Sequence, residues 1–298
     1  MVGSAIAYEA KKKGHEVFGK TLKELDLTNR EAVLRELTTF KPTQLVIAAA
    51  KVGGIGANSS FPVDFLSTNL QIQTNLMDAA HVVGIPRVLF LGSSCVYPKL
   101  ASQPIKESAL LTGELEPSNA PYAIAKIAGL KLIEAYRVQY SHNWIAAMPT
   151  NLYGPRDNFD SETSHVIPAL INRFHTAKLK SSRSVEIWGD GTPLREFLYV
   201  HDLAQACLVL LEKFESSFAI NVGSGQEISI RDLSSLIAKI VGFTGEVTFN
   251  VDRPNGTTRK LLDCSQMSAL GWKPQVSLEE GIALTYSWYL SGLSKELP

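Results

Sequence analysis

The chain has 298 residues, 45% of them hydrophobic, which is enough to bury one large α/β core or a large domain with a smaller partner. The 29 Lys and Arg residues balance 29 Asp and Glu residues, so no global field favours nucleic acid or an anionic membrane as partner. No apolar run approaches the roughly 20 residues of a membrane span, and the three cysteines exclude a disulfide scaffold or a Cys-rich metal site, so we expect a cytoplasmic protein without bound metal.

The first elements along the chain alternate between helical and extended patterns. Residues 2–13 have helical spacing, which Gly14 can terminate, and 15–19 are typical of a short strand. A helix is predicted over 28–40 with Thr28 as its cap, and the continuous apolar run 44–50 predicts a strand buried on both faces.

The alternation continues to residue 150. It predicts a helix over 62–83, a buried strand over 87–94, a helix over 121–140 and a strand over 144–150. Buried strands that alternate with helices indicate an α/β, doubly wound parallel sheet of the Rossmann type, with right-handed crossovers. Ligands of such sheets bind beyond the carboxyl ends of the strands.

The second half is less regular, with more prolines and short glycine turns. We therefore predict a dinucleotide-binding domain over 1–150 and a mainly substrate-binding domain over 151–298. The segment 195–213 is typical of a strand followed by a buried helix. We expect it to return to the first domain, so that the two domains are partly interleaved.

Two short segments carry candidate chemistry. In 122-YAIAK-126 the spacing places Tyr122 and Lys126 on one helix face, where a cation would lower the pKa of the phenol. In 92-GSSCVYP-98 small hydroxyl side chains follow a buried strand, where they can bind a substrate oxygen. A solvated helix face and a Ser-rich turn remain open for each alone. Together they resemble short-chain dehydrogenases/reductases, whose Tyr exchanges a proton as hydride moves to or from a nicotinamide.

Longer blocks are similar to the GDP-L-fucose synthase family. They are 48-AAAKVGGI-55, 89-LFLGSSCVYPK-99, 121-PYAIAKIAGLK-131, 148-MPTNLYGPRDNF-159, 164-SHVIPAL-170, 188-WGDGTPLREF-197 and 259-RKLLD-263. The resemblance implies a bifunctional epimerase-reductase that converts GDP-4-keto-6-deoxy-D-mannose to GDP-L-fucose with NADPH. Epimerisation beside a ketone requires a base on one side of the carbon and an acid on the other.

The resemblance also implies a role for each catalytic residue. Cys95 and His165 match the family's base and acid, although a small buried thiol and a helix-start residue are the alternatives from the sequence alone. Tyr122 is implied as proton donor to the ketone oxygen and Ser93 as its hydrogen-bonding partner. Lys126 is implied to lower the pKa of the Tyr and to hold the nicotinamide ribose.

Ligand contacts follow from the same resemblance. The implied NADP(H) contacts are Gly3, Ser4, Asp26, Leu27, Leu91, Gly92, Ser93, Ser94, Lys126, Pro149, Thr150, Asn151, Leu152 and His165, with Asp26 and Leu27 ending a short strand. The implied substrate contacts are Arg173, Trp188, Arg195 and Asn255. Arg side chains suit the diphosphate oxygens, whereas Trp188 is equally compatible with a domain interface. The family further implies a homodimer formed by the Tyr-Lys helix and its predecessor.

The chain departs from the family at its front. Family members begin with a strand and a G-x-x-G-x-x-G loop that cradles the dinucleotide pyrophosphate, and only the last glycine, Gly3, is present. Our expectation is a truncated or mis-started chain of an otherwise intact enzyme. Family members carry a basic residue after the second strand, where this chain has Leu22. Lys20 or Lys23 are the other candidate partners of the cofactor's 2′-phosphate.

Two alternatives remain open from the sequence. One is another nucleotide-sugar epimerase or dehydratase of the superfamily, against which the pair Cys95 and His165 argues. The other is a catalytically impaired nucleotide-binding protein, which the incomplete glycine loop favours and the intact set of candidate catalytic residues opposes.

Overall fold

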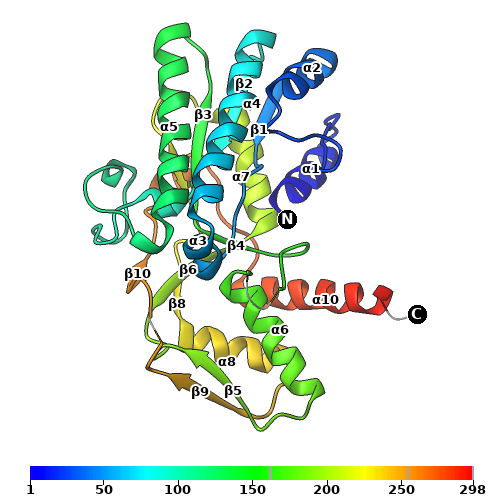
Figure 1. Cartoon of the computed structure of the whole chain (residues 1–298), viewed down its shortest axis with the longest axis vertical. Helices are drawn as coiled ribbons and strands as arrows, with labels where there is room; N and C mark the ends of the chain where they lie inside the picture. The colour runs from blue at the N-terminus through cyan, green and yellow to red at the C-terminus, as the bar shows by residue number, and fades with distance from the viewer. Residues whose placement is uncertain (161–162, 254, 297–298) are drawn as a thin grey trace.

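The computed structural model describes residues 1–160, 163–253 and 255–296. Its main sheet has four parallel strands in the order β1-β2-β3-β7, at the top of Figure 1. These strands are β1 (Gln44–Ile47), β2 (Arg87–Leu91), β3 (Ile145–Pro149) and β7 (Ile220–Val222). The predicted α/β fold with a parallel sheet is confirmed.

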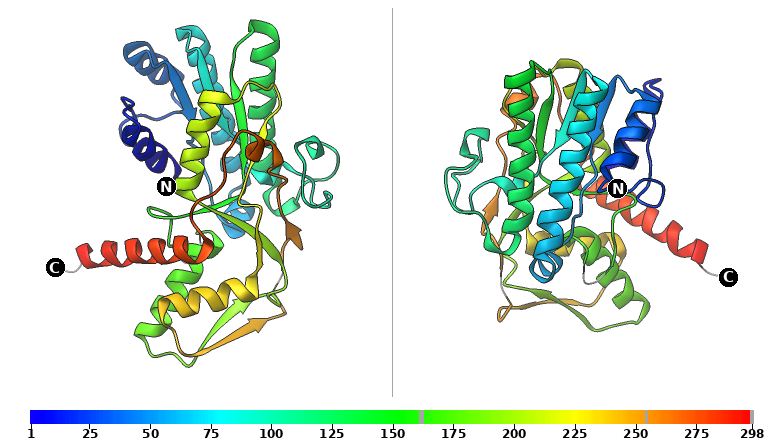
Figure 2. Two further views of the ribbon diagram at one scale, coloured as in Figure 1. Left: turned by 180° about the vertical axis from the view of Figure 1, so that it is seen from behind. Right: turned by 45° about the horizontal axis from the view of Figure 1, so that its top comes forward.

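Helices cover both faces of the main sheet (Figures 1 and 2). One face packs against α1 (Val2–Lys12) and α7 (Val200–Lys213). The other packs against α2 (Arg30–Phe40), α4 (Asn69–Val83) and α5 (Ala120–Tyr140). In β2, Leu89 and Leu91 enter the first core while Val88 and Phe90 enter the second, which explains the uninterrupted apolar run.

The strands predicted over 15–19 and ending at Asp26 and Leu27 are wrong. The chain between α1 and α2 forms turns and irregular backbone, and no described strand pairs with it. Without a neighbouring strand, an extended segment has no ladder to satisfy its backbone groups, and a turn does so locally. The Asp26 carboxylate accordingly accepts hydrogen bonds from the Thr28 amide at 2.9 Å and hydroxyl at 2.8 Å.

Two helix predictions change at their starts. The cap of α2 is Asn29, not Thr28, because its side chain accepts a hydrogen bond from the Ala32 amide at 3.0 Å. The helix predicted over 62–83 is interrupted by a π-helical segment, Asp64–Thr68. At the junction the Asn69 side chain donates to the Phe65 carbonyl at 2.7 Å, and this inserted bond accounts for the change of helical pitch.

The smaller part of the molecule, at the bottom of Figure 1, is built around a third core. Its strands are β4 (Asn151–Tyr153), β5 (Ser184–Trp188), β6 (Leu194–Tyr199), β8 (Glu227–Ser229), β9 (Glu246–Asn250) and β10 (Arg259–Lys260). Its main helices are α6 (Val166–Leu179), α8 (Ile230–Val241) and α10 (Leu278–Glu296). Between them, β6 leads into α7 and β7, which belong to the main sheet layer, so the predicted strand followed by a buried helix is confirmed.

Shorter helices lie in the connecting segments. They are α3 (Ile55–Ser60), α9 (Ser265–Ala269) and the 3-10 turns η2 (Ser94–Val96), η3 (Glu107–Ala109) and η4 (Pro117–Asn119). Within the described ranges, no helix is long and apolar enough to cross a membrane. The same residues contain no cluster of His, Cys, Asp and Glu suited to a metal ion.

Gly129 permits the close approach of α5 to β2. A Cβ atom there would lie 2.4 Å from Phe90 Cζ and 2.8 Å from Gln73 Oε1, and Gln73 is itself held by a 2.7 Å bond to the Ala125 carbonyl. We expect Gly129→Ala to lower the free energy of unfolding by about 1–3 kcal/mol, measured by urea denaturation, because the packed neighbours must shift. Gly292→Ala, a helical position with open space around it, is the control. Equal stability of the two variants would contradict the prediction.

Candidate active site

The candidate catalytic residues gather where the chain leaves the carboxyl ends of the main strands. Ser93 and Cys95 follow β2 directly, and Tyr122 and Lys126 lie in the first turns of α5. This edge of the sheet faces the smaller part of the molecule (Figure 1), as expected for parallel α/β sheets.

Lys126 ties α5 to the end of β2. Its Nζ donates a 2.8 Å hydrogen bond to the Leu91 carbonyl and lies 4.8 Å from the centroid of the Phe90 ring. The residue is 4% exposed, and burial lowers the pKa of its ammonium to about 8. The amine is therefore fixed beside the site rather than free in solvent.

Tyr122 remains a phenol in this environment. Burial is the largest effect raising its pKa, negative charge on Cys95 raises it further, and a hydrogen bond with the Ser93 side chain opposes both. The sequence predicted the opposite direction because of Lys126. The Lys126 ammonium instead binds the Leu91 carbonyl, and its Nζ lies 5.9 Å from the centroid of the Tyr122 ring. The exclusion of water around the phenol therefore has the larger effect on the pKa of Tyr122.

Cys95 is half-buried beside these groups. Its Sγ lies 3.3 Å from Asn119 Nδ2 and 3.7 Å from Lys260 Nζ. Neither donor is predicted from the sequence. The only sequence signal for them is proximity to blocks that resemble the family: Asn119 lies just before 121-PYAIAKIAGLK-131, and Lys260 lies within 259-RKLLD-263. The topology that brings residue 260 to residue 95 is a tertiary feature.

His165 belongs to the smaller part of the molecule, where it directly precedes α6. Its side chain is solvent-accessible and makes no hydrogen bond to another described residue, although the surrounding protein lowers its pKa by desolvation. The imidazole is thus mainly neutral near pH 7. The preceding loop is joined to the main layer because the Gly54 amide donates to the Thr163 carbonyl at 3.0 Å. A Cβ on Gly54 would meet the Ser164 carbonyl at 2.8 Å.

The candidate cofactor residues occupy the same edge. The Thr150 hydroxyl and Asn151 Nδ2 donate to the Glu196 carbonyl at 3.3 and 2.9 Å, which links the end of β3 to β6. The others here are Leu91 ending β2, Gly92 and Ser94 after it, Pro149 ending β3 and Leu152 in β4. They form a continuous border from β2 to β4.

Two candidate cofactor segments lie at the side of this border. Gly3 and Ser4 are exposed in the first turn of α1, where no side chain caps the leading N–H groups. Such a helix start offers donors for phosphate oxygens. Asp26 is exposed in the turn before α2, and the adjoining Leu27 carbonyl is held by Asn75 Nδ2 at 2.9 Å. The uncapped N–H groups at the start of α1 are the donors that fit the pyrophosphate of a dinucleotide.

The candidate substrate residues fall into two groups. Trp188 is 58% exposed at the end of β5, with the Arg253 guanidinium 5.0 Å above its ring, and Asn255 Oδ1 accepts a 2.9 Å bond from the nearby Asp190 amide. Arg173 and Arg195 instead donate to local carbonyls at 2.8 Å, those of Glu186 and Leu194. The structure does not join these two arginines through a common contact.

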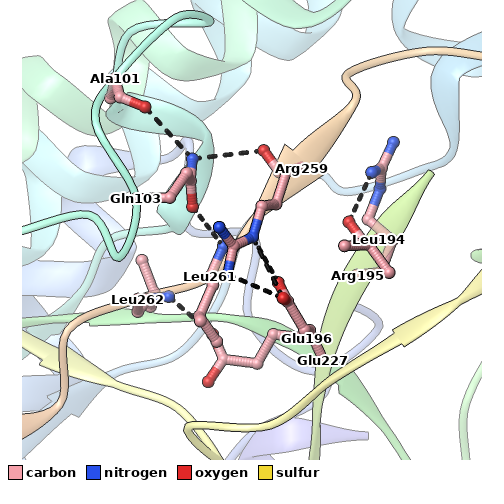
Figure 3. A network of polar contacts seen from close by, with 9 residues as sticks. All are labelled: Ala101, Gln103, Leu194, Arg195, Glu196, Glu227, Arg259, Leu261 and Leu262. Atoms are coloured by element: carbon pink, nitrogen blue, oxygen red, sulfur yellow. Dashed lines mark hydrogen bonds and ion pairs between the residues drawn. The ribbon is translucent and has the colours of Figure 1, made fainter.

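A polar network joins β10 to the loop after Cys95 and to β6 and β8 (Figure 3). Arg259 forms a bidentate ion pair with Glu227, with contacts of 2.8 Å, and Gln103 bonds the backbone on both sides of Lys260. The buried Glu196 carboxylate accepts from the Leu262 amide at 3.1 Å. This network sets how β10 and β6 sit against the loop that follows Cys95.

Comparison with known proteins agrees with this geometry. Residues 1–223 match the NAD dependent epimerase/dehydratase family. The chain is 52% identical over 294 residues to GDP-L-fucose synthase 1 of Arabidopsis thaliana, covering 98% of this chain and 91% of that protein. The chain belongs to the GDP-L-fucose synthase branch of this epimerase family.

Two further relatives of this branch support the assignment. GDP-L-fucose synthase of Escherichia coli (strain K12) is 49% identical over 300 residues, which cover 97% of this chain and 94% of that protein. The crystal structure of a GDP-L-fucose synthetase from Naegleria fowleri bound to NADP superposes with a TM-score of 0.90 at 28% identity, covering 98% of this chain and 92% of that one.

The buried Lys126 ammonium predicts a pH dependence of stability. Its folded-state pKa of about 8 lies below the ordinary value of 10.5, so the unfolded chain binds more protons between these values and stability rises with pH there. The cost of burying the charge is fully present below pH 8. We expect the stability advantage of Lys126→Met over the wild-type protein to shrink by about 2 kcal/mol between pH 7 and 9.5, measured by urea denaturation.

The matched control is Lys131→Met on the same helix, since the Lys131 side chain is 48% exposed and its Nζ lies 2.8 Å from Glu134. Its stability difference from the wild-type protein should stay constant over the same pH range. A Lys126→Met difference that is equally independent of pH would contradict the assigned shift.

Proposed function

We propose that this chain catalyses the epimerisations and the reduction that convert GDP-4-keto-6-deoxy-D-mannose to GDP-L-fucose with NADPH. The observation that carries the proposal is the contact of two chemical groups in one site. Cys95, a candidate base, lies beside the Ser93–Tyr122 pair, which is suited to a reductase proton donor, and Lys126 completes that pair.

Epimerisation requires a proton to leave a carbon next to the ketone. The Cys95 thiolate takes this proton, so that an S–H bond forms, the C–H bond breaks and its electron pair moves to the ketone oxygen as an enolate. The protonated fraction of His165 supplies a proton to the opposite side of the carbon, where a new C–H bond forms with the electron pair that returns from the enolate oxygen. The hydroxyl groups of Ser93 and Tyr122 stabilise the enolate oxygen by hydrogen bonds, which supports placing the sugar ketone between them.

Reduction uses the same oxygen site. When bound, NADPH supplies the hydride. Tyr122 then donates its phenolic proton to the sugar oxygen, and its raised pKa supports the role of an acid that is still protonated at neutral pH. Lys126, held by the Leu91 carbonyl, is placed to bind the nicotinamide ribose.

The proposed cofactor contacts follow the strand ends from α1 to β4. The pyrophosphate lies at Gly3 and Ser4, where the leading N–H groups of α1 have no side-chain cap, and the adenosine portion lies toward Asp26 and Leu27. The nicotinamide side lies along residues 91–94 and 149–152 with His165. Residues 1–150 with the returning α7 and β7 form the proposed dinucleotide-binding domain.

The GDP-sugar is proposed to lie against the remaining part of 151–298. Trp188 and Asn255 are close enough to share the nucleotide end, since Asn255 bonds the Asp190 amide next to the Trp188 turn. Arg173 and Arg195 supply positive charge for the diphosphate. Arg195 is half-buried, and desolvation lowers its pKa, so an anionic ligand would stabilise its charge.

We further propose a homodimer that forms through the outer faces of α4 and α5. Val82, Ile124 and Val138 are apolar residues on these helices with exposures of 67%, 48% and 86%. Val138→Glu should shift the protein from dimer to monomer in sedimentation equilibrium.

The cytoplasm is the proposed location, which the free thiols support.

The proposed function is tested with purified protein, GDP-4-keto-6-deoxy-D-mannose and NADPH in deuterated water. GDP-L-fucose that carries solvent-derived deuterium, detected by NMR and mass spectrometry together with NADPH oxidation, is the expected result. NADPH oxidation without label would leave a reductase only. Neither label nor oxidation, from protein shown by fluorescence to bind NADPH, would overturn the proposal.

A further inference from the structure

The sulfur of Cys95 accepts two hydrogen bonds that the proposed reaction steps do not explain. Lys260 Nζ at 3.7 Å carries only donors when charged, so the sulfur must be the acceptor in this contact. Asn119 Nδ2 at 3.3 Å is the second donor. Bonds from an ammonium and an amide both strengthen when the sulfur becomes anionic.

The strand geometry of β10 directs Lys260 toward the thiol. Successive side chains on a strand point to opposite faces, and β10 pairs with β6 so that Lys260 lies opposite Arg195. Arg259 points to Glu227, with which it forms the bidentate pair. Lys260 therefore points the other way, toward Cys95. It has no ion pair with a carboxylate within the described ranges, so its charge is available to the sulfur.

Gln103 holds the backbone of Arg259 and Leu261, the two neighbours of Lys260 in the chain (Figure 3). Gln103 Nε2 donates to the Arg259 carbonyl at 3.3 Å, and Gln103 Oε1 accepts from the Leu261 amide at 2.8 Å. Gln103 belongs to the loop that continues from Cys95. The same loop thus carries the thiol and grips both neighbours of the lysine, which holds the ammonium near the sulfur.

Asn119 is fixed next to the site from the other side. It ends η4 immediately before α5, three residues ahead of Tyr122, and its Oδ1 atom is buried with no partner among the described residues. A buried acceptor without a partner costs folding free energy. The Asn119 amide therefore keeps its donor on the Cys95 sulfur at a cost to stability.

We propose that Lys260 and Asn119 are positioning residues that direct hydrogen-bond donors at the Cys95 sulfur, with Lys260 as the counter-cation when that sulfur gives up its proton. The role of the thiolate as base rests on the proposed function, whereas its stabilisation does not. Cys95, which follows β2 of the main sheet, then depends on the positive charge of Lys260, which β10 of the smaller part supplies. This contact between Lys260 and Cys95 forms only when the two parts of the molecule are joined correctly.

The test measures how fast Cys95 reacts with iodoacetamide, a neutral reagent that alkylates the thiolate. The intact protein without substrate is labelled at pH 7, and the Cys95 peptide is followed by mass spectrometry, separately from buried Cys207 and half-buried Cys264. We expect Lys260→Met to slow alkylation about tenfold and Asn119→Ala about threefold. Lys260→Arg, which keeps the charge, should stay within about threefold of the wild-type rate.

Lys99→Met is the control for charge, since it also removes one lysine near the site, but one that pairs with Glu116 at 3.3 Å. It should leave the alkylation rate unchanged. In the deuterium assay Lys260→Met should lower kcat for proton exchange about tenfold with KM within about threefold. Circular dichroism confirms that each variant is folded, and Asn119→Ala provides a second, independent measurement if Lys260→Met does not fold.

Unchanged alkylation in folded Lys260→Met would overturn the proposal, and a raised KM in that variant would then indicate that the lysine binds the GDP-sugar. The proposed function fails separately. Slowed alkylation in a protein that incorporates no deuterium would show that the thiolate site exists but that the assigned reaction is wrong.

Discussion

Replacing Tyr122 with Phe is expected to lower the rate of NADPH oxidation by about 10²–10⁴ while solvent deuterium still enters the sugar. The phenol is the proposed proton donor for reduction, whereas the base for epimerisation is Cys95. The change removes one hydroxyl and its hydrogen bond with Ser93 and leaves the ring packed against Phe65, 6.4 Å away. The measurement pairs absorbance at 340 nm with NMR of the deuterium content.

Tyr140→Phe is the matched control, because it removes a phenol from the exposed end of the same helix, where Gln139 is its 2.8 Å partner. It should oxidise NADPH at the wild-type rate. Reduction by Tyr122→Phe at the wild-type rate would contradict the assignment of the proton donor. Loss of deuterium exchange as well would show that the Ser93 hydroxyl alone is not sufficient to stabilise the enolate.

Replacing Cys95 with Ser is expected to remove deuterium incorporation by a similar factor, about 10²–10⁴. A serine hydroxyl is close in size but holds its proton much more strongly than a thiol, so it cannot serve as base near pH 7. The contacts from Asn119 and Lys260 can still form, which keeps the local structure intact. The exchange rate in deuterated water, followed by mass spectrometry, measures the effect.

Cys264→Ser is the control for this variant, because Cys264 is also half-buried but lies in the chain after β10. Its exchange rate should match that of the wild-type protein. NADPH binding by Cys95→Ser should likewise be unchanged, since Cys95 is not among the proposed cofactor contacts. Full deuterium exchange by Cys95→Ser would exclude the thiol as base and leave His165 as the candidate base.

Periodicity along the chain predicted most of the regular structure correctly. The buried strands β1, β2 and β3 were legible because residues on both faces are apolar, and α5 because its apolar spacing extends over many turns. The strand predicted over 15–19 failed because a strand exists only where another strand pairs with it. Local pattern carries no information about that partner.

The candidate site divides in the same way. Tyr122 and Lys126 share a helix and Ser93 and Cys95 share a loop, so their proximity within each pair follows from local spacing. The approach of the two pairs, through which Ser93 and Cys95 affect the pKa of Tyr122, required α5 to pack on β2 through Gly129.

By itself, the sequence determined the α/β class, the strand-end position of the site and the family of the chemistry, because these depend on residue types at short, regular spacings. Only the tertiary structure decided the charge environment. It placed the Lys126 ammonium against the Leu91 carbonyl and buried Tyr122, and this burial raises the pKa of the phenol. It also brought Lys260 from β10 to the sulfur of Cys95. Desolvation and long-range contacts depend on what surrounds a group in space, which neighbouring residues in the chain do not specify.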